Sequence, residues 1–330
     1  MRLSMLLATL VLLLTACPSD GGKEPVSTPA TSAPPTSESH TATSPAPARP
    51  SSSGEGPTEM PRPGDPAVGT AVNAVRHLAG VIGPRHGTSP AFERAARWAG
   101  MRLRGLGYDV RRQRFAVPGG VSWGVPVPPG RSVNVVASPT GFDAGRAHVV
   151  VGAHLDTVPQ APGAEDNASG VGVLLAVAEA VAGARTRLPV VFVAFGAEEP
   201  RGSTDDDHHY GSRHYVGVLT PSQRDQVRGM VSLDRVGVGQ VLPVCGATTG
   251  PDPLESAVLR AARRAGVAAT PCGVNRSSDH WSFVRAWLPG VRLGSTPYAG
   301  YHSPADVPRV VNRGQLSRAG RTVVSWLSGR

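Results

Sequence analysis

The sequence predicts a single α/β domain in which a mixed, mostly parallel sheet is sandwiched between helices. Short runs of β-branched residues alternate along the chain with longer segments whose apolar residues recur at helical spacing. This alternation starts near Asp65, where a region rich in Ser, Thr, Pro, Gly and Ala ends. No internal repeat is present in the sequence. The alternating strands and helices are therefore expected to form one domain over residues 67–330.

Helical spacing is clearest at residues 90–106, where Phe92, Ala95, Ala99 and Leu103 fall on one face. The other predicted helices cover residues 68–78, 168–182, 253–265 and 310–327. The predicted strands cover residues 108–117, 132–137, 147–153, 188–195, 229–234, 241–245 and 291–293. Strands that alternate with helices favour parallel pairing, because a crossover helix returns the chain to the same end of the sheet.

Residues 1–16 resemble an export signal. Arg2 supplies a positive charge, an apolar run follows, and Leu14-Thr15-Ala16 precedes Cys17. The run is too short to span a bilayer, and a small residue before a cysteine resembles the bacterial lipobox, in which the cysteine receives a lipid. We predict an exported protein anchored through Cys17 to the outer face of the bacterial cytoplasmic membrane. The alternative is an ordinary cleaved signal and a secreted protein.

Residues 17–66 contain almost no large apolar side chain. Such a segment cannot bury enough surface to offset the entropy of ordering it. We therefore predict a disordered tether that holds the folded domain away from the membrane.

The net charge of +9 raises the possibility of a nucleic-acid or anionic-surface partner. However, Lys23 is the one lysine among the 33 basic residues, a bias typical of genome-wide codon composition. No zinc-finger spacing, RNA-binding aromatic motif or basic zipper is present. We expect a solvated basic face and no nucleic-acid partner.

Two cysteines, Cys245 and Cys272, lie in the folded part of the chain. Export would place them in an oxidising compartment. We predict a disulfide between them, with two buried free thiols as the alternative.

Acidic residues follow three of the predicted strands. His154 and Asp156 end the strand at 147–153, Glu198 and Glu199 follow the strand at 188–195, and Asp234 ends the strand at 229–234. Unpaired carboxylates at strand ends would repel one another, so they must protonate or bind a cation. Ion-paired structural acids are the alternative for any one of them.

A polar loop and a later segment complete the candidate site. Asp166 begins the Asp-Asn pair ahead of the helix at 168–182, and His302 lies in the segment YHSPAD. With His154, Glu199 and Asp234 they form a nitrogen and oxygen ligand set suited to zinc. Two Zn²⁺ would be neutralised by three carboxylates and a hydroxide, whereas one would leave excess negative charge, so two ions per chain are predicted.

The segments AHLDT, EDNASG, AEE, SLD, SDHWSF and YHSPAD, in this order, resemble the M28 family of zinc peptidases. The resemblance covers the chain from about Asp65 to its end and implies the zinc-dependent exopeptidase fold with an aminopeptidase activity on peptide substrates. The M20 peptidases also share His-x-Asp and paired glutamates. They have a longer separation before the bridging aspartate and typically an inserted lid domain, which argues against them.

The resemblance also implies a role for each site residue. Asp166 would bridge two zinc ions, with His154 and Asp234 on one ion and Glu199 and His302 on the other. Three further roles are implied: Glu198 as general base and then proton donor, Tyr301 as hydrogen-bond donor to the oxyanion, and Asp156 as the residue that orients His154. Asp279 and Asp306 would orient ligands, contact substrate or cap local structure.

One departure from the family pattern lies between Glu199 and Gly211, where the chain has the longer segment PRGSTDDDHHY. Asp205 to His209 would hold a third ion, form part of the substrate rim or, as we expect, make a solvated loop. The insertion leaves the substrate preference open. The sequence as a whole does not give the oligomeric state, and the ligand types also allow Mn²⁺ or Co²⁺.

Two other functions are compatible with the same residues. A glutaminyl cyclase resembles this family but uses one zinc for acyl transfer, and a surface-binding domain would have lost its catalytic activity. The complete set of ligands and the general-base candidate argue against the second.

Overall fold

A computed structural model describes residues 60–329, and an eight-stranded sheet lies at the centre of this part of the chain. The strands are β1 (Asp109–Val117), β4 (Gly130–Ser138), β5 (His148–His154), β6 (Val190–Phe195), β7 (Val227–Leu233), β8 (Leu242–Gly246), β9 (Ala269–Val274) and β10 (Gly290–Leu293). Their order is β1-β4-β6-β5-β7-β10-β8-β9, and the central strands β6, β5, β7 and β10 are parallel. A separate ribbon pairs β2 (Gly120–Ser122) with β3 (Val125–Val127).

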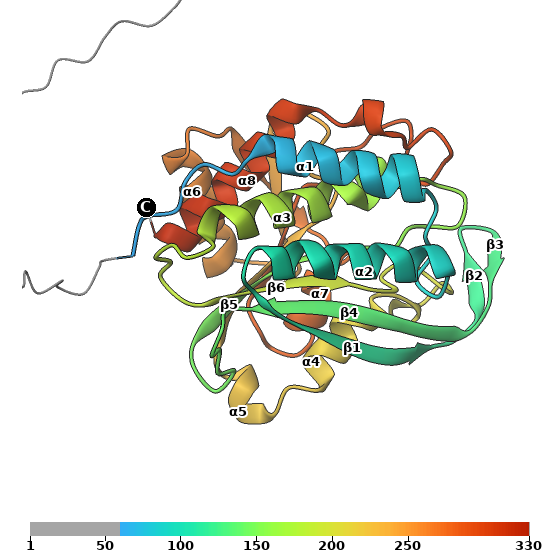
Figure 1. The fold of residues 1–330 in the computed structure, drawn as a ribbon, viewed down its shortest axis with the longest axis horizontal. Coiled ribbons are helices and arrows are strands. Elements are labelled where there is room, and N and C mark those ends of the chain that lie inside the picture. The colour runs from blue at the N-terminus through green and yellow to red at the C-terminus, as the bar shows by residue number, and fades with distance from the viewer. Residues whose placement is uncertain (1–59, 330) are drawn as a thin grey trace, which may run out of the picture. The chain divides into compact units, whose positions relative to one another are not determined.

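Helices cover both faces of the sheet (Figure 1). They are α1 (Val68–Val75), α2 (Pro90–Gly105), α3 (Gly170–Val181), α4 (Tyr210–Gly217), α5 (Pro221–Arg224), α6 (Pro253–Arg264), α7 (His280–Val284) and α8 (Arg313–Ser328). Four short helical segments join them: η1 (Arg76–Ile82), η2 (Ala164–Ser169), η3 (Asp205–Asp207) and η4 (Pro308–Val310). Buried residues of α1, α2, α3, α6 and α8 pack in one core cluster, and those of α4 and α7 in another.

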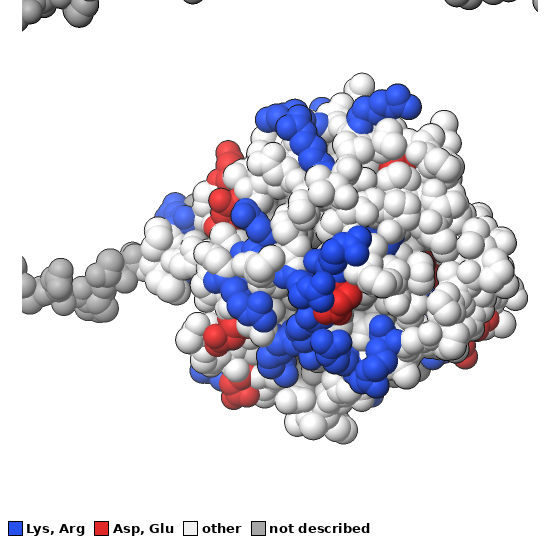
Figure 2. All heavy atoms as spheres, turned by 45° about the vertical axis from the view of Figure 1, so that its right-hand side comes forward, with Lys and Arg blue, Asp and Glu red and all other residues white. Residues whose placement is uncertain are grey.

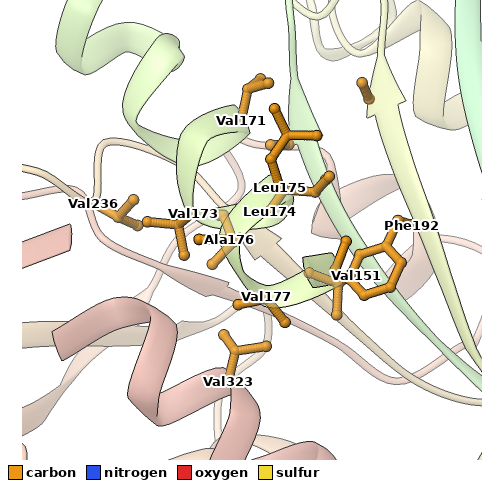
Figure 3. Packing of buried hydrophobic residues seen from close by; sticks show 14 of the residues in the cluster. Val151, Val171, Val173, Leu174, Leu175, Ala176, Val177, Phe192, Val236 and Val323 are labelled. Carbon is orange, nitrogen blue, oxygen red and sulfur yellow. The ribbon is translucent and has the colours of Figure 1, made fainter. Parts of the chain in front are cut away.

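Helix α3 lies at the centre of the larger core. Its sequence is apolar on almost every side, which is typical of a helix that is buried all round. Figure 3 shows Val177 of α3 between Val151 of β5 and Val323 of α8. A β-carbon at Gly172 would lie 2.6 Å from the carbonyl oxygen of Ala71, so α1 approaches α3 more closely than a larger residue would allow.

The predicted fold class is confirmed: the domain has a mixed sheet with a parallel centre between helical layers. The predicted strands and long helices are present, with end points that differ by a few residues. Helices α4, α5 and α7, strand β9 and the β2-β3 ribbon were not predicted from the sequence. These elements are short, and β9 is mostly exposed and contains Pro271 and Gly273, so none has a clear hydrophobic period.

Cys245 of β8 and Cys272 of β9 form a disulfide, with their Cα atoms 4.9 Å apart. Cys245 is fully buried, whereas Cys272 lies on the exposed edge strand. The bond therefore fastens the last strand of the sheet to its neighbour.

The predicted export signal, Cys17 and the predicted tether up to residue 59 lie outside the described residues. The segment just before α1 already contacts the domain. The carbonyl oxygen of Pro61 accepts a hydrogen bond of 2.8 Å from the backbone N–H of Arg185, and Pro66 is buried. Within residues 60–329, no helix combines the length and the apolar character needed to cross a bilayer.

Candidate metal centre

Three of the predicted site segments follow neighbouring parallel strands. His154 is the last residue of β5, Glu198 and Glu199 come soon after β6, and Asp234 directly follows β7. β5 pairs in parallel with β6 on one side and with β7 on the other. The carboxyl ends of these strands therefore meet at one edge of the sheet, where open α/β sheets bind ligands.

Asp166 and His302 reach the same edge from two loops. Asp166 Oδ1 is 3.2 Å from His154 Nε2, and its Oδ2 is 3.1 Å from His302 Nε2. Glu199 Oε2 lies 3.6 Å from His302 Nε2, and Asp234 Oδ1 lies 3.7 Å from His154 Nε2. The structure thus brings all five predicted ligands together, with Asp166 between the two histidines.

The chemistry of these residues fits a bound cation. Ligand atoms of His154, Asp166 and Glu199 lie within 4.8 Å of one another, and so do those of His154, Glu198 and Asp234. All are buried, and Glu199 Oε1 has no hydrogen-bond partner among the described residues. Burial, with the nearby charges of Asp166 and Glu198, raises the pKa of Glu199 well above its usual value. Buried carboxylates this close need a positive charge, and nitrogen and oxygen ligands suit zinc.

Asp306 positions the loop that carries Asp166. Its Oδ1 accepts a hydrogen bond of 2.8 Å from the backbone N–H of Glu165, and its Oδ2 accepts one of 3.1 Å from that of Asp166. The Glu165 carboxylate in turn accepts from the backbone N–H groups of Gly237 and Val238, shortly after β7. The sequence left several roles open for Asp306. Its hydrogen bonds favour one of them, the orientation of the ligand Asp166.

The contacts of Asp156 differ from the predicted ones. Its Oδ1 is 3.9 Å from His154 Nδ1, too far for a hydrogen bond, and His154 Nδ1 instead faces the Asp156 backbone oxygen at 3.3 Å. The carboxylate accepts from the backbone N–H groups of Glu198 at 3.0 Å and Glu199 at 3.2 Å. The reason is the close pairing of β5 with β6, which brings the turn after β6 over Asp156. Asp156 therefore holds the two glutamates in position.

Replacing Asp156 with asparagine is expected to weaken zinc binding by about 10- to 100-fold, the usual cost of losing a contact that orients a ligand. An asparagine offers one acceptor oxygen where Asp156 uses two, so one of the two N–H groups loses its partner. Competition with a chelator measures the affinity, and Asp143→Asn in an exposed turn is the matched control. Unchanged zinc affinity would show that Asp156 does not position Glu199.

The structure also places a histidine from the insertion next to Glu198. His209 Nε2 is 3.2 Å from Glu198 Oε1, and the backbone N–H of His209 donates to the carbonyl oxygen of Glu198 at 2.9 Å. His209 is buried, so the prediction of a solvated loop is wrong at this residue, although Asp205 and Asp206 are exposed. Burial lowers the pKa of His209 to about 4 and raises the pKa of Glu198 to about 7.

Asp279 is fully buried, with no hydrogen-bond partner for either carboxylate oxygen among the described residues. Burial raises the pKa of Asp279 to about 7. Among the charged groups around His209, Asp279 acts most strongly on the pKa of that histidine. The sequence left the role of Asp279 open, and its electrostatic interactions with Glu198 and His209 place it near that pair.

Two arginines that the sequence analysis missed lie beside Asp234. Arg292 Nη2 is 3.1 Å and Arg235 Nε 4.0 Å from Asp234 Oδ1. Burial alone would raise the pKa of Asp234, but the charge of Arg292 holds it below its usual value. The sequence did contain a signal for Arg292, because it is a charged residue inside the apolar strand β10. Arginines are rarely fully buried without a partner, so its position indicates a buried acidic neighbour.

Aromatic residues form the rim of the site. Tyr301 stacks on His302 with ring centres 3.7 Å apart, and the Arg235 guanidinium lies 4.4 Å from the Tyr301 ring. Trp123, from the β2-β3 ribbon, packs edge-on against His302 at 4.2 Å and is half exposed. These residues and the ligands line a pocket of about 120 Å³. Tyr301 is therefore close enough to contact a molecule bound at the ligands.

Comparison with known protein families gives a match to the part of the chain that contains all five predicted ligands. Residues 134–327 match peptidase family M28. The aminopeptidase YwaD of Bacillus subtilis is 29% identical over 187 residues, which are 54% of this chain and 40% of that protein. This chain thus spans less than half the length of that curated relative.

Solved structures share the fold. A zinc aminopeptidase from Bacillus subtilis superposes with a TM-score of 0.70 and 18% identity, over 79% of this chain and 94% of that one. A glutaminyl cyclase from Bacteroides thetaiotaomicron, bound to N-acetylhistamine, superposes with a TM-score of 0.70 and 19% identity, over 82% of this chain and all of that one. At these identities the likeness shows the fold alone.

Proposed function

This chain belongs to peptidase family M28, whose members are zinc peptidases, and from that membership we propose that it is a di-zinc aminopeptidase. It removes amino-terminal residues from peptides outside the membrane. The observation that carries the proposal is the position of Asp166, whose two carboxylate oxygens each face a different histidine. An aspartate so placed is suited to join two cations.

The ligands divide into two sets around Asp166. His154 and Asp234 would hold one zinc, Glu199 and His302 would hold the other, and Asp166 would contribute an oxygen to each. When bound, the ions supply the Lewis acidity that makes a water nucleophilic near neutral pH. Asp156 and Asp306 keep the ligands in place through the backbone hydrogen bonds described above.

Glu198 is the acid–base group of the proposed reaction. It takes a proton from the attacking water and delivers it to the leaving amine. The geometry supports this role, because the Glu198 carboxylate is buried and lies within 4.8 Å of ligand atoms of His154 and Asp234. Tyr301, on the rim of the pocket, donates a hydrogen bond to the developing oxyanion.

Zinc content and turnover together test the proposal. Purified protein is expected to hold two zinc ions per chain by elemental analysis and to release aminoacyl anilides. A chelator should abolish release, and added zinc should restore it. One zinc per chain with cyclisation of amino-terminal glutamine, and no anilide release, would instead identify a glutaminyl cyclase. Bound zinc without either reaction would leave a surface-binding domain.

A further inference from the structure

Arg292 places a permanent positive charge at one half of the metal centre. It lies on β10 opposite Ser232 of β7, is 1% exposed, and reaches Asp234 Oδ1 with its Nη2 at 3.1 Å. Arg235 adds a second guanidinium 4.0 Å from the same oxygen. An arginine does not lose its charge in a protein, so an ion held by Asp234 must bind beside a fixed cation.

The guanidinium of Arg292 is held in place from its other side. Its Nη1 donates to the backbone oxygen of Ser277 at 3.1 Å, to Ser277 Oγ at 2.9 Å and to Asn275 Oδ1 at 3.3 Å. These three bonds would have to break for the side chain to turn away from Asp234. The positive charge therefore stays next to this ligand when an ion binds.

The other half of the centre has no such contact. Among residues 60–329, no arginine forms an ion pair with Glu199, whose ion-pair partner is His302. Arg85 is also fully buried, but its guanidinium donates to backbone carbonyls, at 2.7 Å to Leu155 and 2.6 Å to Pro162. No guanidinium therefore balances the charge that the Glu199 carboxylate carries when it binds a cation, whereas the charge of Asp234 is already partly balanced by Arg292.

We infer that Arg292 makes the two metal positions unequal, so that Glu199 and His302 hold their zinc tightly while His154 and Asp234 hold theirs weakly. The inference rests on the proposed two-ion site. With Arg292 included, one Zn²⁺ already balances the three ligating carboxylates, so the second ion gains less from binding. The charge count made from the sequence, which predicted two ions, did not include this arginine.

Zinc titration of the metal-free protein tests the inference. With a competing chelator of known affinity, the wild type is expected to bind zinc in two steps whose dissociation constants differ at least about tenfold. Asp234→Asn should remove the weaker step and Glu199→Gln the tighter one. In Arg292→Met the weaker step should tighten at least about tenfold, equivalent to about 1.4 kcal/mol, while the tighter step changes less than about threefold.

Two further variants separate charge from shape. Arg292→Lys keeps the charge and should keep the two steps unequal, and Arg285→Met, which breaks an exposed ion pair with Asp206, should change neither. Equal steps in the wild type, or an unchanged weaker step in Arg292→Met, would overturn the inference. If Arg292→Met does not fold by circular dichroism, Arg292→Gln replaces it, and the wild-type and Asp234→Asn titrations still decide whether the positions are unequal.

Anilide release tests the proposed function separately from the inference. Two unequal zinc steps in a protein that releases no amino-terminal residues would reject the aminopeptidase and keep the inference. Anilide release with two equal zinc-binding steps would reject the inference and keep the proposed aminopeptidase.

Discussion

Replacing Glu198 with alanine is expected to leave both zinc ions bound and to reduce the turnover number by about 10²- to 10⁴-fold, the usual contribution of a general acid–base group. In the proposed site Glu198 is not a ligand, and its carboxylate contacts His209 at 3.2 Å. Removing it takes away the group that accepts the proton of the attacking water. The positions of Glu199 and Asp166 are set by other contacts, so metal binding should persist.

The measurement pairs zinc content with the rate of anilide release. Glu179→Ala, an exposed glutamate of α3, is the matched control and should keep full activity. Undiminished turnover in Glu198→Ala would remove Glu198 from the mechanism. Loss of one zinc would instead make it a ligand, a role compatible with its closeness to His154 and Asp234.

Replacing Asp166 with asparagine is expected to abolish both metal binding and hydrolysis. Asp166 has contacts with His154 and His302 through different oxygens, so the change affects both metal positions at once. A change to a group that only orients a ligand costs about 10- to 100-fold in zinc affinity, and the loss of a shared ligand should exceed that. Burial alone would raise the pKa of Asp166, yet the two histidines hold it well below its usual value.

Zinc content after dialysis and anilide release measure this effect, with Asp225→Asn as an exposed control. Circular dichroism establishes that the variant is folded. A folded Asp166→Asn protein that retains two zinc ions per chain would show that Asp166 does not join them. Retention of one zinc would assign Asp166 to a single ion.

The basic surface contributes to none of these predictions. Figure 2 shows basic side chains gathered on one face of the molecule with few acidic residues among them. On α2 and β1, three of the arginines, Arg97, Arg112 and Arg114, lie around Glu93. β1 is an edge strand, where charged side chains discourage pairing with another sheet.

The fold class and the five predicted ligands followed from spacing along the chain. His154, Glu199 and Asp234 each come at or just after the end of a β-branched run, and the ends of parallel strands share one edge of a sheet. Asp166 was found in the polar loop ahead of a predicted helix, and His302 in the later segment YHSPAD. Such local patterns are visible without a structure, because each depends only on residues that are close together in the sequence.

The tertiary structure alone decided what surrounds those ligands. His209 belongs to a polar segment that has no hydrophobic period. Its place beside Glu198 depends on backbone hydrogen bonds, donated by His209 and Tyr210, that fold the loop back onto the turn after β6. Arg292 is one of 33 basic residues, and it reaches Asp234 because β10 pairs with β7. Spacing along a chain does not specify the order of strands in a sheet or the closure of a loop, since these depend on contacts between distant residues.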